Sequence, residues 1–138
     1  MITGQQKEEY LAFFNRILLL DMEMKDVKMI TEIDDKGKPI AVTVFSNCSR
    51  FNMEISVASV KGWTASRRYI KEYVKYAFQT CGVLRLTIYV PESNATSLKF
   101  SKRLGFVREF DGVLKNWFGR VNGVQLVMFK DENKWLTT

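Results

Sequence analysis

Apolar residues recur every three or four positions near the start of the chain, between residues 5 and 21. The apolar side of this stretch is formed by Tyr10, Phe13, Phe14, Ile17 and Leu18, and charged residues occupy the other sides. Such spacing places all five side chains on one face of a helix. The pattern therefore predicts an amphipathic helix that buries one face.

The period then changes from helical to alternating. Residues 27–33 and 40–45 alternate apolar and polar positions, and the turn-forming run Asp-Asp-Lys-Gly-Lys-Pro separates them. This arrangement is typical of a hairpin. Residues 51–60 continue the alternation after a short turn at 47–50, so the sequence predicts a third strand and an antiparallel meander.

The second half of the chain mixes both periods. Thr64 or Ser66 can cap a helix that ends near Gly82, and residues 84–90 form a β-branched strand that Pro91 ends. A short helix at 95–104 stops at Gly105, a strand begins at Phe106, and Asn122-Gly123 predicts the turn of a last hairpin. Strands and helices in this order imply a right-handed crossover with a parallel strand pair.

These elements define the expected fold class as α/β (α+β): a mixed, mainly antiparallel sheet with a central parallel strand pair and flanking helices. No repeat, low-complexity tract or linker interrupts the chain, so residues 1–138 are predicted to form a single domain. The longest apolar run, residues 17–20, is far shorter than the ~20 residues of a membrane span. The acidic start lacks the pattern of a secretory signal, so we expect an intracellular protein with no membrane partner.

Composition removes several kinds of chemistry. The chain contains no histidine, which excludes His-ligated zinc and the Ser-His-Asp and Cys-His hydrolases. Cys48 and Cys81 lie far apart in the sequence and are expected to be buried reduced thiols. We therefore expect no metal site.

Positive charge is concentrated in one part of the chain. Residues 61–103 contain nine basic and two acidic residues, although the net charge of the whole chain is only +6. Arg67 and Arg68 fall in the first turn of a predicted helix, where they oppose the helix dipole unless an anion binds there. The alternative is that both side chains simply extend into solvent. A nucleic-acid partner has weaker support, because only the pI of about 9.4 favours it and no recognised motif accompanies the charge.

One segment resembles a known family. Residues 94–106, Asn-Ala-Thr-Ser-Leu-Lys-Phe-Ser-Lys-Arg-Leu-Gly-Phe, resemble the GNAT-superfamily N-acetyltransferases in the asparagine, the small residue three positions later and the closing Gly-Phe. The Gly-Trp followed by arginine, the Tyr-Ala-Phe of the preceding helix and the ending Val-Met-Phe-Lys-Asp-Glu-Asn-Lys-Trp-Leu resemble the small GNAT-like proteins of tailed bacteriophages. The likeness covers roughly residues 40–136.

The resemblance implies an acyl-CoA site. In such folds the strands corresponding to 51–60 and 84–90 run parallel and splay apart, the pantetheine arm lies between them, and the pyrophosphate rests on the start of the intervening helix. The implied acetyl-CoA-binding residues are Val57, Ala58, Ser59, Val60, Lys61, Gly62, Trp63, Thr64, Ala65, Ser66, Arg67, Arg68 and Asn94. The loop departs from the family pattern, since Gly62 is its one glycine and stands out of register.

The resemblance also implies catalytic positions. Glu54 is the candidate general base, with a solvent-facing strand residue as the alternative and Glu32 as the reserve. Ser101 occupies the position of the tyrosine that protonates the departing thiolate in the family. A stripe of three tyrosines, Tyr69, Tyr73 and Tyr76, either stacks on an adenine or forms a packing face; Trp117 and Trp135 are assigned to packing.

Two functions remain open from the sequence. The first is an acyl-CoA-dependent N-acyltransferase in which an amine, a small molecule or a protein, attacks acetyl-CoA directly in a ternary complex. The second is a non-catalytic GNAT-fold binding protein, such as a phage virion component or an inhibitor of a host protein, with a phage or host protein as partner. The expected location is the cytoplasm, that of the host for a phage-encoded chain, or the virion.

Overall fold

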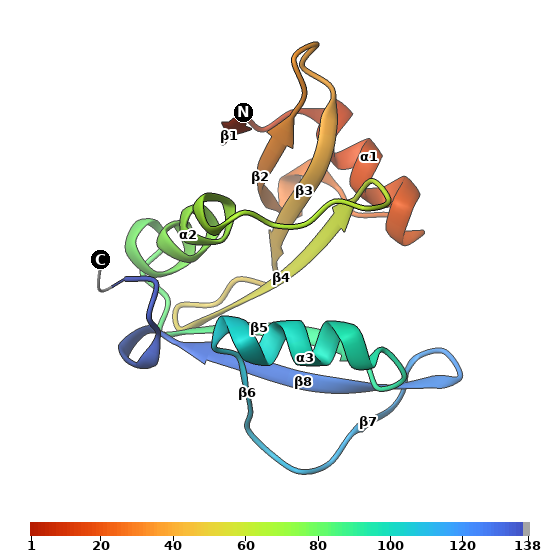
Figure 1. Cartoon of the computed structure of the whole chain (residues 1–138), viewed down its shortest axis with the longest axis vertical. Coiled ribbons are helices and arrows are strands. Elements are labelled where there is room, and N and C mark those ends of the chain that lie inside the picture. Colours follow the sequence, from red (N-terminus) through yellow and green to blue (C-terminus); the bar gives the residue numbers. More distant parts are fainter. Residues whose placement is uncertain (137–138) are drawn as a thin grey trace.

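The alternating stretches of the sequence pair into one sheet in the computed structural model, which describes residues 1–136 (Figure 1). Within these residues the sheet has eight strands in the order β1-β2-β3-β4-β5-β8-β6, with β7 also paired to β8. The strands are β1 (Ile2–Thr3), β2 (Lys28–Ile33), β3 (Pro39–Ser46), β4 (Asn52–Ser59), β5 (Arg85–Pro91), β6 (Val107–Arg108), β7 (Leu114–Phe118) and β8 (Val121–Phe129). The helices are α1 (Glu8–Leu18), α2 (Arg67–Lys75) and α3 (Ala95–Leu104), with short helical turns at Met24–Asp26, Tyr76–Thr80 and Lys130–Glu132. The predicted mixed fold is confirmed.

The amphipathic helix α1 covers one face of the sheet. Its buried residues Tyr10, Leu11, Phe13 and Phe14 pack against Val42, Val44 and Ala58 of β3 and β4 in a separate hydrophobic cluster. The helix ends earlier than predicted because Leu19 adopts a left-handed conformation with φ of 55°. Of the five residues predicted on its apolar face, Tyr10, Phe13 and Phe14 are buried, whereas Ile17 and Leu18 are 38% and 36% exposed. The predicted face is therefore correct in its first part and wrong in its last turn.

The opposite face carries the larger core under α2 and α3. Ser66 rather than Thr64 caps α2: its hydroxyl accepts a hydrogen bond from the Tyr69 amide at 3.0 Å. The Tyr69 hydroxyl donates a hydrogen bond to the Ile30 carbonyl at 3.1 Å and forms another with Thr43 Oγ1 at 2.8 Å. These buried bonds attach the first turn of α2 to β2 and β3.

Strands β4 and β5 form the parallel pair that the sequence predicts, but they pair only briefly. Asn52–Glu54 lie opposite Arg85–Thr87, and no pairing follows. In contrast, β3 pairs with β4 as far as Ser59, and β8 pairs with β5 as far as Pro91. The inner edges of β4 and β5 are thus separated over their second halves, while both outer edges stay hydrogen-bonded.

Helix α3 follows β5 and has the boundaries that the sequence predicts. The Asn94 side chain accepts a hydrogen bond from the Ser97 amide at 3.0 Å, and Gly105 ends the helix with φ of +111°. Leu98, Phe100 and Leu104 pack on the same core as α2. Both helices therefore lie on one side of the splayed strands (Figure 1).

The turn of the last hairpin is not where the sequence predicts it. Phe118 pairs with Val121, so Gly119 and Arg120 form the turn, and Gly119 supplies the positive φ of 73°. Gly123 instead lies inside β8 beneath Trp117, where a Cβ atom would stand 2.9 Å from the Trp117 Cβ. This glycine allows close approach of a side chain and does not form a turn.

The cysteine prediction is wrong about burial, although both thiols are free as predicted. Both Cys48 and Cys81 are exposed free thiols. Cys48 belongs to the loop between β3 and β4, and Cys81 follows the helical turn after α2. Both lie at chain segments that turn at the edge of the core, so their apolar character did not determine their burial.

We expect Gly123→Ala to lower the free energy of unfolding by about 1–3 kcal/mol, because the added methyl overlaps Trp117 and one of the two strands must shift. Chemical denaturation measures the loss. Gly4→Ala is the matched control, since a Cβ there meets nothing within 4 Å. Equal stability of the Gly123→Ala variant and the unmodified protein would contradict the assigned contact.

Candidate functional site

A cleft of about 810 Å³ opens where β4 and β5 separate. Its walls come from both strands, from the loop before α2, and from α2 and α3. At its margin lie Phe118 of β7, Leu18 at the end of α1 and Leu20 just after that helix. None of the described residues that line it is charged. The cleft is therefore suited to an extended, largely uncharged chain.

The cleft extends to both faces of the sheet. Along β4, Met53 and Ile55 belong to the core under the helices, so Glu54 and Ser56 between and after them point to the other face. We call the face of Glu54 and Ser56 the open face, because neither α2 nor α3 covers it, although α1 packs on it at Ala58. We call the face under α2 and α3 the helix face. Ser56 and Tyr89 line the cleft from the open face, and Tyr73 lines it from the helix face. Two molecules that approach from opposite sides of the sheet can meet in this gap.

Glu54 lies at the start of the gap. Its carboxylate accepts a hydrogen bond from the Tyr89 hydroxyl at 2.7 Å and another from the Asn47 amide. Burial, and then the bond to Glu54, raise the pKa of Tyr89 to about 12. Tyr89 itself lines the cleft, and its ring lies 4.7 Å from that of Trp117. The negative charge of Glu54 is thus one hydroxyl group away from the cleft.

A second polar cluster holds the paired part of the two strands. Asn52 Oδ1 accepts hydrogen bonds from Thr87 Oγ1 at 2.6 Å and from Arg85 Nε at 3.3 Å. Arg85 also forms a salt bridge with Glu109. These contacts link β4 to β5 immediately before the strands separate, so they determine where the gap begins.

Sequence reasoning missed Tyr89 as a site residue and assigned Trp117 to packing alone. Trp117 is 51% exposed and contacts Tyr89, so it forms part of the open-face margin of the site. A signal for Tyr89 was present: it lies two residues after Thr87 on the neighbouring parallel strand, on the same face as Glu54.

The predicted cofactor-binding residues divide into two groups. Those that line the cleft are Val57, Ser59, Trp63, Thr64, Ala65 and Asn94. Those that lie outside its lining are Ala58, Val60, Lys61, Gly62, Ser66, Arg67 and Arg68. Ala58 is buried against α1 on the opposite face, because residues alternate along β4.

The conformation of the loop between β4 and α2 explains why its one glycine is at position 62. Gly62 has a φ of +86° in a tight turn that the Trp63 amide closes on the Val60 carbonyl at 3.2 Å. The Trp63 ring packs edge-on against Tyr69, 5.2 Å between centroids, and its Nε1 donates to Glu32 at 3.3 Å. Trp63 therefore forms a wall of the cleft and leaves the gap open, and Glu32 lies outside the lining.

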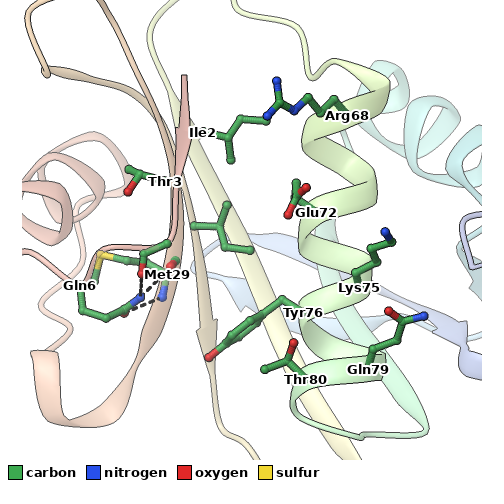
Figure 2. Close-up of a pocket in the computed structure, with 12 residues that line it drawn as sticks. Ile2, Thr3, Gln6, Met29, Arg68, Glu72, Lys75, Tyr76, Gln79 and Thr80 are labelled. Carbon is green, nitrogen blue, oxygen red and sulfur yellow. Dashed lines mark hydrogen bonds between the residues drawn. The ribbon is translucent and has the colours of Figure 1, made fainter.

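The two arginines at the start of α2 point away from the cleft. The Arg67 guanidinium lies 5.4 Å from the Trp135 ring. Arg68 lies with Glu72 and Lys75 along the side of α2 that faces Ile2 of β1 (Figure 2). The contact of these side chains with phosphate groups stays a prediction.

Figure 2 shows a second hollow, of about 420 Å³, between β1 and α2. Gln6 forms part of its floor and is held by two hydrogen bonds of 2.9 Å with the Met29 backbone. The charged residues around it belong to α2 and are exposed or half-buried. They extend along one side of α2 and do not converge on one point.

One predicted alternative, the role of the tyrosine stripe, is decided by packing. Tyr69 and Tyr73 are buried, and Tyr76 is half-buried against Phe45, so this stripe is a packing face. Asn94 both caps α3 and lines the cleft, and the cap uses only its Oδ1 atom. Ser101 is 8% exposed and lines the cleft from α3.

Neither a metal nor a membrane site is found in the described part of the chain. No group of three or more His, Cys, Asp and Glu residues among 1–136 is arranged to hold a metal ion. The helices within the same residues are too short or too polar to cross a membrane.

Comparison with known proteins gives similarity in structure only. No protein-family model matches the sequence, and no curated protein matches it. A chimera of the spermidine N-acetyltransferase of Vibrio cholerae and hSSAT matches with a TM-score of 0.78 and 13% identity, covering 99% of this chain and 98% of the other. The Vibrio cholerae enzyme in complex with CoA and spermine matches with a TM-score of 0.76 and 10% identity over 96% of each chain.

A third similar structure is the ribosomal-protein-S5-alanine acetyltransferase of Vibrio fischeri, with a TM-score of 0.65 and 18% identity. The match covers 80% of this chain and 65% of the Vibrio fischeri protein, slightly under two thirds of its length. These neighbours are N-acetyltransferases of the GNAT family, and the chain has their fold.

The half-buried Tyr89 predicts how stability depends on pH at alkaline values. Folding raises the pKa of Tyr89 above its ordinary value of 10, so the stability associated with its neutral form is complete below pH 10 and is lost as the pH rises through about 12. We expect Tyr89→Phe to weaken the fall in unfolding free energy between pH 10 and 11.5, measured by urea denaturation. Glu54→Gln should weaken it in part, since burial, the larger cause, remains. Identical slopes in all three proteins would contradict the assigned environment of Tyr89.

Proposed function

We propose that this protein is an N-acyltransferase that transfers an acyl group, in the simplest case acetyl, from acyl-CoA to an amine. One observation carries the proposal: an uncharged cleft crosses the sheet where two parallel strands separate, and a carboxylate lies one hydroxyl group from it on the open face. The neighbouring structures are N-acetyltransferases, and one of them is a complex with CoA.

The unpaired inner edges of β4 and β5 are the proposed site of the pantetheine arm. Backbone N–H and C=O groups there have no strand partner, and an amide-containing chain can hydrogen-bond with them as an added strand does. Asn94 lines the same cleft, and its amide nitrogen is not used in capping the helix. Val57, Ser59, Thr64 and Ala65 complete the channel toward the start of α2.

The phosphate groups are proposed to lie at the start of α2. The first amides of a helix lack intrahelical partners and attract anions, and Thr64 and Ala65 lead from the cleft to this point. The concentration of basic residues between 61 and 103 adds a favourable field.

The acceptor amine is proposed to enter from the open face. Its nitrogen attacks the thioester carbonyl carbon, the Glu54 carboxylate takes up a proton through Tyr89 or a bridging water, and strand amides stabilise the developing oxyanion. The electron pair of the breaking C–S bond moves to sulfur. The products are an amide and free CoA.

A small cationic amine is the acceptor that this face suits best. Glu54 is negatively charged, and the exposed Trp117 ring beside Tyr89 offers a surface for a cation. One neighbouring structure is a complex with spermine. A cytoplasmic setting, in a host cell for a phage-encoded chain, is part of the same proposal.

A non-catalytic binding protein is the second candidate. Two features favour it. The loop between β4 and α2 has a single glycine, so its backbone cannot approach phosphate groups as closely as a glycine-rich loop can. Ser101 also stands where the resemblance places a tyrosine, so the phenol of that tyrosine is absent. An amine-dependent release of CoA separates the two functions, since only an enzyme produces it.

Binding of the cofactor arm is tested with Val57→Trp. The larger ring should occupy the gap and weaken the binding of CoA at least tenfold in calorimetry, because Val57 lines the cleft beside the unpaired edge of β4. Val107→Trp is the matched control. Val107 is 48% exposed on β6 and lies outside the cleft lining, so the affinity of this variant for CoA should be unchanged. Absence of saturable binding to the unmodified protein at millimolar CoA would refute the proposed function.

The role of Glu54 is tested with Glu54→Gln. The amide keeps the size of the side chain but cannot accept a proton, so turnover with acetyl-CoA and a polyamine should fall by about 10²-fold. The affinity for CoA should be unchanged, since the cofactor lies on the helix face. Equal turnover in the two proteins would assign proton uptake to water or to another group.

A further inference from the structure

Acyl transfer in this cleft leaves a sulfur that needs a hydrogen-bond donor. The described lining carries no charge and is mostly apolar, so a thiolate that forms there loses most of its hydration. Ser101, at the position where the resemblance places a phenol, has only an alcohol. This inference rests on the proposed function and concerns the group that replaces the missing phenol.

Three aromatic residues of the cleft lining already use their polar groups in hydrogen bonds. The Tyr69 hydroxyl is bonded to Thr43 and to the Ile30 carbonyl. The Trp63 Nε1 donates to Glu32, and the Tyr89 hydroxyl donates to Glu54. Apart from the Asn94 amide, the remaining polar side chains of the lining are Tyr73, a threonine and serines.

Tyr73 differs from the other two tyrosines of the lining, Tyr69 and Tyr89, in that its hydroxyl is unengaged. Its side chain is 4% exposed, and no residue among 1–136 hydrogen-bonds with its hydroxyl. The one fully enclosed side-chain polar atom without a partner in this part of the chain is Thr31 Oγ1, so the Tyr73 hydroxyl reaches accessible space. Tyr73 lines the cleft, which is the space it reaches.

The surroundings keep this phenol neutral. Burial raises the pKa of Tyr73 well above its usual range, and the nearby Tyr69 adds to the effect. A neutral phenol can donate a hydrogen bond at every pH where the protein functions. A phenol is also a stronger acid than the alcohols of Ser101 and the other hydroxyl groups in the lining.

We propose that Tyr73 is the catalytic residue that donates a hydrogen bond from its hydroxyl to the departing sulfur of CoA. As the C–S bond of the tetrahedral intermediate breaks, its electron pair moves to sulfur, and the Tyr73 hydrogen bond stabilises the thiolate that forms. The amine proton passes separately to Glu54 and from there to solvent. The thiolate takes up a proton from solvent as CoA leaves, so the proton balance of the reaction is complete.

The first experiment measures the bound thiol and requires no turnover. The ionisation of CoA bound to the protein is followed by thiolate absorbance in the unmodified protein and in Tyr73→Phe. A hydrogen bond from Tyr73 favours the thiolate, so the pKa of the bound thiol should rise by about one unit or more when the hydroxyl is removed. Equal values in the two proteins would overturn the proposal.

The second experiment measures transfer of acetyl to a polyamine. Tyr73→Phe should lower kcat by about 10–100-fold with little change in the KM for acetyl-CoA, and Tyr73→Phe with Ser101→Tyr should recover much of the loss. Tyr76→Phe is the matched control, because Tyr76 lies on the helical turn that follows and does not line the cleft. A purely structural role would give lower stability without the rescue.

The two proposals fail differently. Absence of CoA binding to the unmodified protein would overturn both. CoA binding without amine-dependent release, together with the expected thiol shift, would refute catalysis and retain the contact between Tyr73 and sulfur. Turnover with an unchanged Tyr73→Phe variant would retain the enzyme and overturn the role of Tyr73.

Discussion

The separation of β4 from β5 is the constraint on which the rest of the site depends. Each unpaired backbone N–H or C=O inside a sheet costs free energy unless water or a ligand binds it. The outer edges of both strands remain hydrogen-bonded to β3 and β8 along the separated halves, so the strands cannot slide together to pair their inner edges. The sheet therefore contains a rigid gap whose backbone groups are available to an incoming chain.

The gap begins at a defined point because polar side chains hold the strands on one side of it. Asn52, Arg85 and Thr87 connect the paired segment, and Tyr89 reaches Glu54 just beyond it. These contacts all lie on the open face, while the helix face is apolar and covered by α2 and α3. The two faces thus offer different chemistry to molecules that meet in the gap.

The helix face combines close packing with an unengaged phenol hydroxyl. The Tyr69 hydroxyl is hydrogen-bonded and attaches α2 to β2 and β3. Tyr73, one turn later, lines the cleft, and its hydroxyl has no hydrogen-bond partner among the described residues. Residues of the same type at helical spacing therefore have different roles. The difference depends on which strands lie opposite each ring, which the spacing alone does not encode.

Local signals determined the elements, and contacts between distant segments determined the site. The chain by itself defined α3 because its limits depend on an asparagine cap and a glycine with positive φ, both local properties. The alternation of β2, β3 and β4 was likewise readable, since each strand has one face in a core. The turn of the last hairpin was predicted at the wrong place. Gly123 is needed because Trp117 packs over it, and the turn preference of Asn-Gly is not used at this position. Tertiary structure alone placed Tyr89 against Glu54, turned Arg67 toward Trp135 and left the Tyr73 hydroxyl facing the cleft, because each depends on residues at least 20 positions away in the chain.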